Sequence, residues 1–456
     1  MRLKLDKDLK ILLAVVLIIF VVNIFLIHPT FSDENFYFNV AKAVSEGKTP
    51  YKDFFLSHPP LQTYALALLF KIFGSSFLVA KLLSIAASAG CVIFVFLIGR
   101  QLFDKKSAWL AVTFFLANPI FLAFSSMGYG VWEAMLLVLA SIYLLISEKV
   151  KHRYFAAGIF FAAAVFFRYI ALLYLPLTIL ILVMHKKTKI TGFITTFVAA
   201  TLPAFIMLYA LFGQTYFDQT VAYHLVFKTQ KTLQINQYWA FGYFLLFLVA
   251  LSVFVAYIEK NKLLLLFAVV PLAIDIFILL VFKFAFYHYF LISLPFYCLA
   301  AARAFVVSKY KIVKLIIPAI FVLMLVYNLS TLDFYLNPQQ SEKFYRVVSF
   351  VGNMLAETEN KNLKIFGEPV MTNYVSFVSG VGVAGNYFDT YLDHLVWEGE
   401  RSVIEKIAAD KPAVFIDMQL YGAYFRLNPE FSAYLQNYKL TMEVEGLPRY
   451  FVYIPG

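Results

Sequence analysis

Residues suited to chemistry are concentrated in one polar stretch, residues 31–61, which follows the first long apolar segment of the chain. The stretch begins with two adjacent acids, Asp33 and Glu34, and ends with the run His58-Pro59-Pro60-Leu61. A carboxylate can take the proton of an acceptor hydroxyl, while a cation can bind a phosphate and stabilise it as it leaves. Lys52 and His58 supply cations in the same stretch. Transfer chemistry on a phosphate-bearing substrate is therefore one hypothesis for it.

The same residues also have a structural interpretation. Ser32 or Asp33 could cap a helix that runs from about Glu34 to Glu46, because acidic and hydroxyl side chains are favoured at helix N-termini. Apolar residues recur on one face of that helix, so we expect it to lie in the membrane interface with this face down. Lys52 and His58 would then be no more than charges of a solvated loop.

Other ionisable residues lie at the ends of apolar segments or interrupt them. Glu133 begins one such segment, Arg168 interrupts another, and Lys283 and His288 lie between two more. Charge at membrane depth is costly and is often kept for function, although Glu133 could simply reach the interface. Asp275 lies deeper in its segment, and we expect it to be a structural partner for one of the cations.

The composition excludes a soluble protein. The 456 residues are 62% hydrophobic and only 14% charged, and the mean hydropathy is +0.78. A soluble domain has about 25% charged residues. The net charge of +11 comes from short basic clusters between apolar runs, which indicates cytoplasmic loops and not a nucleic-acid surface. Cys91 and Cys298 lie in apolar runs with no metal-site or disulfide spacing.

The apolar runs predict a polytopic α-helical membrane protein with about eleven spanning helices. A span requires roughly 20 apolar residues; two of the runs, 154–167 and 170–185, are short and are separated only by Arg168 and Tyr169. The first run is expected to be a retained helix and not a cleaved signal peptide. Basic clusters then all fall on the cytoplasmic side, together with the N-terminus, if Leu61–Phe73 is a juxtamembrane or re-entrant helix. We therefore expect a multi-pass protein of the plasma membrane. The predicted spans are residues 11–27, 77–99, 107–124, 132–147, 154–167, 170–185, 190–211, 239–258, 263–281, 287–306 and 315–332.

This topology divides the chain into two predicted domains. Residues 1–332 form a transmembrane domain whose first extracytoplasmic loop spans 28–76, and residues 333–456 form a small extracytoplasmic α/β domain. The second prediction rests on short apolar strands that alternate with amphipathic helices.

The topology also places all the candidate acids and cations on the extracytoplasmic side, which suits a lipid-phosphate head group held at the interface. Asp33 and Glu133 could alternatively bind a divalent cation that screens the phosphate.

Several segments resemble a known family. SDENFYFNVAKAVSEGKTPYKDFFLSHPPLQTYALALLFKIFG resembles the first extracytoplasmic loop of the GT-C membrane glycosyltransferases, in particular the protein O-mannosyltransferase and lipid A aminoarabinose transferase group. In that family an acidic pair follows the first helix and a basic residue, often Lys, precedes Pro-Pro-Leu. Glu133 matches a later acid, often Asp, and Arg168 a position often held by Lys. YHYFLISLPFYCLAAARA, which contains His288, resembles the family's aromatic and proline-containing helix. The resemblance covers residues 10–310 and is strongest over 31–74.

The resemblance implies a function. The donor would be a sugar linked to a polyprenyl phosphate, transferred with inversion to an extracytoplasmic acceptor, which could be a protein, lipid A or another glycan. Asp33 would be the general base or a metal-associated acid, assisted by Glu34 and Glu133. The cations would bind the donor phosphate, with either no cofactor or a divalent metal. These cations are Lys52, His58, Arg168, Lys283 and His288. A transporter or flippase of lipid-linked sugars is the alternative function, since broken helices and intramembrane charges are also typical of transporters.

Overall fold

The computed structural model describes residues 6–25, 27, 32–118, 121, 124–148, 150–185, 190–228, 236–282, 287–336, 338–356, 363–419, 425–445 and 449–456. The chain divides into two compact units, each formed by two separate segments. Met1–Leu26 and Lys81–Leu336 form what we call the helical unit, and Ile27–Ala80 and Asn337–Gly456 form the mixed unit. The domain boundary predicted from the sequence, at 332/333, places residues 27–80 in the transmembrane domain. In the structure these residues belong to the same unit as the C-terminal segment.

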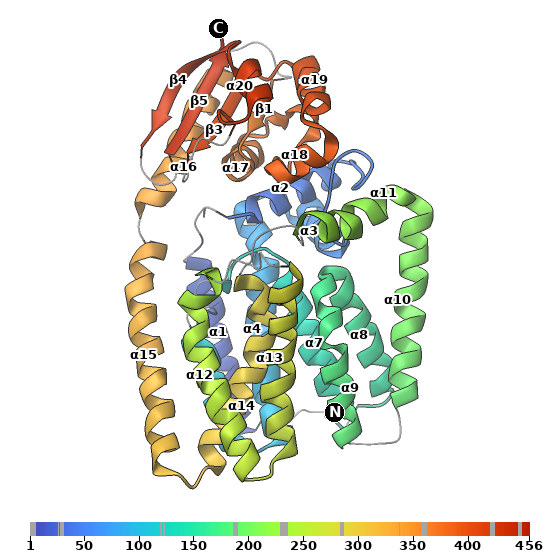
Figure 1. The fold of residues 1–456 in the computed structure, drawn as a ribbon, viewed down its shortest axis with the longest axis vertical. Coiled ribbons are helices and arrows are strands. Elements are labelled where there is room, and N and C mark those ends of the chain that lie inside the picture. Colours follow the sequence, from blue (N-terminus) through green and yellow to red (C-terminus); the bar gives the residue numbers. More distant parts are fainter. Residues whose placement is uncertain are drawn as a thin grey trace. The chain divides into compact units, whose positions relative to one another are not determined.

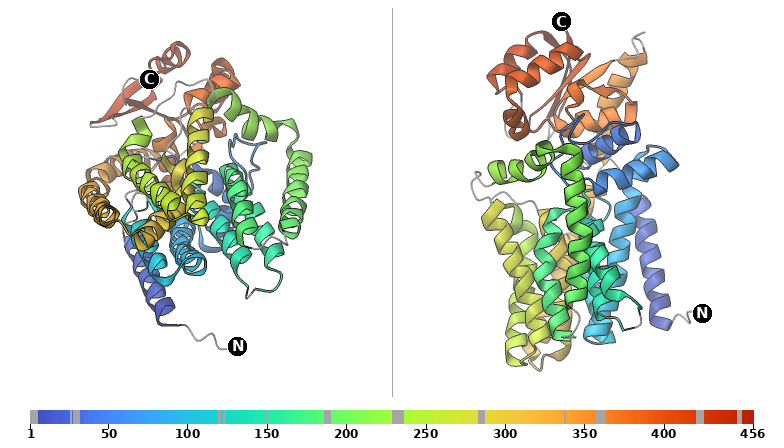
Figure 2. Two further views of the ribbon diagram at one scale, coloured as in Figure 1. Left: turned by 60° about the horizontal axis from the view of Figure 1, so that its bottom comes forward. Right: turned by 90° about the vertical axis from the view of Figure 1, so that its right-hand side faces the viewer.

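The helical unit is built from long apolar helices that run alongside one another (Figures 1 and 2). Contacts join α7 with α8, α8 with α10, α5 with α14, and α12 with both α13 and α14. Its main elements are α1 Lys7–Phe25, α4 Phe77–Leu102 (most of which belongs to this unit), α5 Lys105–Ala117, α7 Val131–Ile146, α8 Arg153–Phe167, α9 Leu175–His185, α10 Ile190–Phe212, α12 Asn236–Ile258, α13 Lys262–Phe282, α14 Leu294–Val307 and α15 Lys311–Leu336. Two 3-10 helices, η1 Tyr169–Tyr174 and η4 Tyr287–Ser293, precede α9 and α14 directly.

Length and composition make several of these helices suitable for crossing a membrane. Within the described residues, five helices are both long and apolar enough, namely Lys7–Phe25, Phe77–Leu102, Ile190–Phe212, Lys262–Val281 and His288–Val307. Large apolar side chains such as Leu17, Ile206 and Leu280 are about 60% exposed on them, which suits contact with lipid. A multi-pass helical membrane protein is therefore confirmed, while the count of eleven spans and the cytoplasmic N-terminus stay predictions.

Close helix packing and one helix break shape the part of this unit that carries the predicted site. Gly158 of α8 lies against α10, where an added Cβ would be 2.8 Å from the backbone nitrogen of Phe197, so only glycine permits this approach. The predicted spans 154–167 and 170–185 correspond to α8 and to η1 followed by α9. Arg168 lies at the break, with an extended backbone (φ −152°, ψ 122°).

The mixed unit combines two helices of the first loop with a five-stranded sheet. The sheet has the order β2-β1-β3-β5-β4; β1 is parallel to β2 and β3, whereas β5 is antiparallel to β3 and β4. The strands are β1 Lys364–Gly367, β2 Gly382–Val383, β3 Val414–Gln419, β4 Tyr438–Val444 and β5 Arg449–Pro455. The helices are α2 Glu34–Ser45, α3 Leu61–Phe73, α16 Pro338–Ala356, α17 Pro369–Ser379, α18 Leu392–Glu398, α19 Glu400–Asp410 and α20 Pro429–Leu435.

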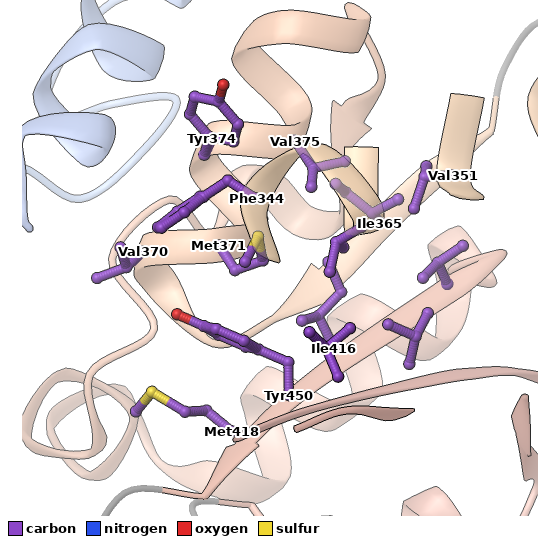
Figure 3. Close-up of a cluster of buried hydrophobic side chains, with 14 of the residues drawn as sticks. Phe344, Val351, Ile365, Val370, Met371, Tyr374, Val375, Ile416, Met418 and Tyr450 are labelled. Carbon is purple, nitrogen blue, oxygen red and sulfur yellow. The ribbon is translucent and has the colours of Figure 1, made fainter. Parts of the chain in front are cut away.

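Apolar cores cover both faces of this sheet because successive strand residues point to opposite faces. Val414 and Ile416 of β3 join a core with Phe344 and Val351 of α16 and with Met371 and Val375 of α17 (Figure 3). Phe415, between them in sequence, joins a second core with residues of α19 and α20, such as Ile407 and Phe431. The sheet is therefore the middle layer between α16 and α17 on one face and α19 and α20 on the other.

The predicted elements of the first loop can now be compared with the structure. The helix expected from Glu34 to Glu46 is α2, Glu34–Ser45, and Leu61–Phe73 is helix α3 with the predicted bounds. The apolar face of α2 is not open to a membrane surface, contrary to expectation: ten of the twelve residues of the helix are buried, among them Phe36 and Val40. Its position at the membrane interface stays a prediction. Its polar side is covered by α17, where Asn39 donates a hydrogen bond to Asn373 (3.0 Å) and Lys42 donates to the carbonyl of Phe377 (3.2 Å).

Candidate active site

Asp33 occupies the N-cap position of α2 but does not cap it. Its backbone is helical (φ −63°, ψ −8°) and its side chain makes no capping hydrogen bond. The carboxylate instead accepts a hydrogen bond at Oδ1 from the hydroxyl of Tyr391, which is more than 350 residues away in the sequence. The alternative that the Asp33 side chain is a plain helix cap is therefore wrong. A carboxylate that is not used for capping remains available for chemistry.

Glu34, the second acid, is completely buried in the first turn of α2. A third carboxylate, Glu368, is affected by the charge of Asp33. Glu368 is the N-cap of α17 and accepts hydrogen bonds from the backbone N–H groups of Val370 (2.9 Å) and Met371 (2.7 Å). Burial raises the pKa of Glu368 to about 7 against the lowering effect of these two N–H groups. The mixed unit thus holds an acidic cluster around the start of α2.

The two cations predicted in the first loop differ in their surroundings. His58 is half-buried: its backbone carbonyl accepts a hydrogen bond from the hydroxyl of Tyr51 (2.7 Å), and its ring lies 5.5 Å from that of Tyr37 on α2. Lys52 is exposed and forms no ion pair within the described part of the chain. His58 is therefore held near α2 by packing, while Lys52 fits the solvated alternative better.

Glu133 is the acid of the helical unit. It lies in the first turn of α7, is only 4% exposed, and accepts a hydrogen bond at Oε1 from the hydroxyl of Ser84 on α4 (2.7 Å). Its other oxygen, Oε2, is buried and has no hydrogen-bond partner among the described residues. A buried polar atom of this kind is costly unless a ligand or solvent satisfies it. This supports the functional reading of Glu133 over a side chain that merely reaches the interface.

Arg168 and His288 converge on Tyr129 in the same unit. Nε of Arg168 donates to the carbonyl of Tyr129, and the imidazole of His288 stacks on the Tyr129 ring with centroids 4.7 Å apart and planes at 17°. Arg168 is 8% exposed, and its charge interacts favourably with Glu133. The structure therefore brings Glu133, Arg168 and His288 together. Lys283, the remaining predicted cation, lies outside the described residues.

Lys81, a further cation of the helical unit, is not among the site residues predicted from the sequence. It lies on α4, three residues before Ser84, so the two side chains share one face of the helix. Lys81 is only 1% exposed. A lysine inside the predicted span 77–99 was itself a signal, because ionisable residues in membrane segments are rarely without a role.

The expectation for Asp275 is wrong. We expected a cation as its partner, but its two carboxylate oxygens accept hydrogen bonds from the hydroxyls of Ser293 and Tyr297, each at 2.6 Å. Tyr174 extends this network through its hydroxyl, 2.6 Å from that of Ser293. Hydroxyl donors satisfy a buried carboxyl group without adding a second buried charge.

A metal role for Asp33 and Glu133 stays a prediction. These two acids belong to different units, and the part of the chain that the structure describes contains no group of three His, Cys, Asp or Glu side chains placed to hold a metal ion. We therefore assign no step of the chemistry below to a metal.

Comparison with known proteins supports the resemblance found in the sequence. Residues 57–202 match the family model of dolichyl-phosphate-mannose-protein mannosyltransferase. None of the curated proteins matches the sequence.

Solved structures show a similar fold. ArnT from Cupriavidus metallidurans in the apo state is similar with a TM-score of 0.66 at 11% identity, over 97% of each chain. The same protein bound to undecaprenyl phosphate gives 0.64 at 12% identity, also over 97% of each chain. A weaker similarity, with a TM-score of 0.49 at 12% identity, is to the Archaeoglobus fulgidus oligosaccharyltransferase, over 89% of this chain and 69% of that one. The resemblance to GT-C membrane glycosyltransferases is therefore confirmed, by a domain match over residues 57–202 and by an ArnT-like fold across the chain.

Proposed function

We propose that this protein transfers a sugar from a polyprenyl-phosphate carrier to an acceptor on the extracytoplasmic side of the plasma membrane. The observation that carries the proposal is the shared fold: over 97% of both chains, it is the fold of a protein solved with undecaprenyl phosphate bound. The match of residues 57–202 to a family whose description names a dolichyl-phosphate-linked sugar points to the same class of donor.

The ionisable groups described above fit the requirements of such a reaction. Asp33 takes the proton of the acceptor hydroxyl, and the oxygen forms a bond to the anomeric carbon of the sugar. The bond between that carbon and the phosphate oxygen breaks with inversion, and the carrier leaves as lipid phosphate with one additional negative charge. Arg168 and His288 bind this phosphate, since charge-assisted hydrogen bonds strengthen as the negative charge increases.

Glu133 has a supporting role in this proposal. Its carboxylate interacts favourably with Arg168 and is anchored by Ser84. An acid that orients a buried guanidinium keeps the cation in place when the phosphate is absent, and so reduces the reorganisation required on binding. Lys52, His58 and Lys283 are proposed as further phosphate-binding residues, with Lys52 the weakest candidate because it is exposed.

The test is a transfer assay with purified protein, a panel of polyprenyl-phosphate sugars and extracts that contain candidate acceptors. We expect free lipid phosphate to form together with a glycosylated product, and Asp33→Asn to abolish both while the protein still purifies as the wild type does. Asp53→Asn, a change of the same kind at an exposed acid of the same loop, is the matched control and should retain transfer.

The assay also separates the alternative function. A flippase would move the lipid-linked sugar across a vesicle membrane without consuming it. Donor translocation with no release of lipid phosphate, or transfer that proceeds at the normal rate in Asp33→Asn, would contradict the proposal.

A further inference from the structure

The segment 384–398, which joins β2 to α19, packs against the first loop at several points within the mixed unit. Asn386 accepts a hydrogen bond from Lys48 (2.6 Å), and Phe388 packs edge-on against Phe54 (5.4 Å between ring centroids). All four groups belong to the same compact unit. The C-terminal part of the chain is therefore in direct contact with the loop that carries the proposed base.

One contact in this region reaches the proposed base itself. The phenolic hydroxyl of Tyr391 donates a hydrogen bond to Oδ1 of Asp33. Hydrogen bonds to a charged acceptor are stronger than those between neutral groups. A phenol that holds one carboxylate oxygen also fixes the rotation of the carboxylate about its Cβ–Cγ bond. Orientation of this kind is a substantial part of what a positioned catalytic group contributes.

The backbone of Tyr391 is itself held from both sides. Its N–H donates to Oδ1 of Asp389 (3.3 Å), and its carbonyl accepts from the N–H of His394 (2.9 Å). The preceding residue, Thr390, is fully buried and donates its hydroxyl to the carbonyl of Gly367 at the end of β1. Tyr391 therefore projects from a segment anchored to the central sheet, as a precise hydrogen-bond donor requires.

His394 connects the same segment to the other end of the first loop. Its ring is 1% exposed and stacks on Phe55, with centroids 3.7 Å apart. Nδ1 of the ring is hydrogen-bonded to the carbonyl oxygen of Asp389, and Nε2 lies 3.2 Å from Oε1 of Glu398. One buried histidine thus links the turn before Tyr391 to the part of the loop that leads to His58.

We propose that Tyr391 is a positioning residue for Asp33, and that the C-terminal segment 384–398 is consequently part of the catalytic machinery. The inference rests on the proposed function, because it assigns Tyr391 a task only if Asp33 acts as the base. Tyr391 touches Asp33 and is given no contact with substrate. Its effect should therefore appear in the rate of the chemical step and not in the affinity for the donor.

The test compares Tyr391→Phe with wild-type protein in the transfer assay. We expect kcat to fall roughly 10- to 100-fold, the effect of one hydrogen bond to a charged group, with the KM for the donor unchanged within about twofold. Tyr434→Phe is the matched control, because it removes a hydroxyl that is paired with another tyrosine hydroxyl (3.1 Å, Tyr438) in the same unit. It should keep the wild-type kcat. Melting temperatures of both variants show whether each is folded.

Each outcome has a defined consequence. A lower kcat in Tyr391→Phe alone, at an unchanged donor KM and a melting temperature near that of Tyr434→Phe, supports the positioning role. A wild-type kcat in Tyr391→Phe, when wild-type protein is active and Asp33→Asn is not, overturns this inference and leaves the proposed function intact. An equal loss of kcat in both tyrosine variants shows a structural role only and also overturns it. Inactivity of wild-type protein on every donor overturns the proposed function, and this inference with it.

Discussion

The buried carboxyl group of Glu368 gives the protein a stability that depends on pH. Burial raises the pKa of this group from 4.5 to about 7 in the folded protein, and the charge of Asp33 acts in the same direction. A rise of this size corresponds to roughly 3 kcal/mol. Because the folded state binds the proton more tightly than the unfolded state, the stabilising contribution is complete below about pH 4.5 and is lost as the pH rises through about 7.

Glu368→Gln removes this titration and one capping hydrogen bond. The N–H groups of Val370 and Met371 bond to different oxygens of Glu368, Oε1 and Oε2, and glutamine keeps only one of these as an acceptor. We expect the variant to be less stable than wild-type protein near pH 4.5 by about 1–3 kcal/mol, because one N–H group loses its partner. From pH 4.5 to pH 8 the stability of the variant relative to wild-type protein should rise by roughly 3 kcal/mol, because wild-type protein must then either ionise a buried acid or retain an unfavourable proton.

Thermal unfolding of detergent-purified protein at the two pH values provides the measurement. The difference between the melting temperatures of the variant and of wild-type protein should therefore change between the two pH values. For a unit of this size, roughly 3 kcal/mol corresponds to a change of about 6–12 °C in that difference. Other groups titrate over the same range, among them His394, but they are common to both proteins and cancel in the difference. Glu405→Gln, at an acid that is 72% exposed, is the control and should show no such change. A Glu368→Gln difference that is the same at both pH values would refute the reasoning.

Three further predictions follow from single positions. Arg168→Ala should raise the KM for the donor roughly 10- to 100-fold, since it removes a charged phosphate ligand; an unchanged KM in a steady-state titration of the donor would return Arg168 to a structural role. Gly367→Ala should destabilise the mixed unit by more than about 3 kcal/mol, because Gly367 has a φ of +145° and an added Cβ would lie 1.9 Å from the carbonyl oxygen of Ile416. Recovery of normally folded protein by size-exclusion chromatography would contradict this. Phe55→Ala should destabilise the mixed unit by about 3 kcal/mol, because it removes a buried ring that stacks on His394; a melting temperature like that of wild-type protein would disprove it.

Local features of the sequence were sufficient to predict helix α2 of the first loop and several strands of the C-terminal segment. Helix α2 begins at Glu34 as expected because its apolar residues recur with helical spacing, and Gly47, with φ of +103°, follows its end. Strands β1, β3 and β5 lie at the apolar runs 363–366, 413–416 and 450–454. These features depend on neighbours in the chain, which one sequence displays directly.

What the sequence did not predict depends on contacts between distant residues. Helix α2 is covered by α17, and Asn39 and Asn373, which form a hydrogen bond between the two helices, are separated by 334 residues in the sequence. Tyr391 carries no signal of its own, since a tyrosine in a polar segment is ordinary, and only its position against Asp33 gives it meaning. Asp275 was predicted to pair with a cation because a buried carboxylate often does, but hydroxyls of η4 and α14 satisfy it instead.

The most direct test of the central claim is the stoichiometry of donor consumption by purified protein in lipid vesicles. With a polyprenyl-phosphate sugar labelled in the sugar, we expect one molecule of free lipid phosphate to appear for each sugar found on an acceptor. Asp33→Asn should show neither product, while Asp53→Asn shows both. Wild-type protein that moves or binds the donor but releases no lipid phosphate with any sugar of the panel would contradict the account.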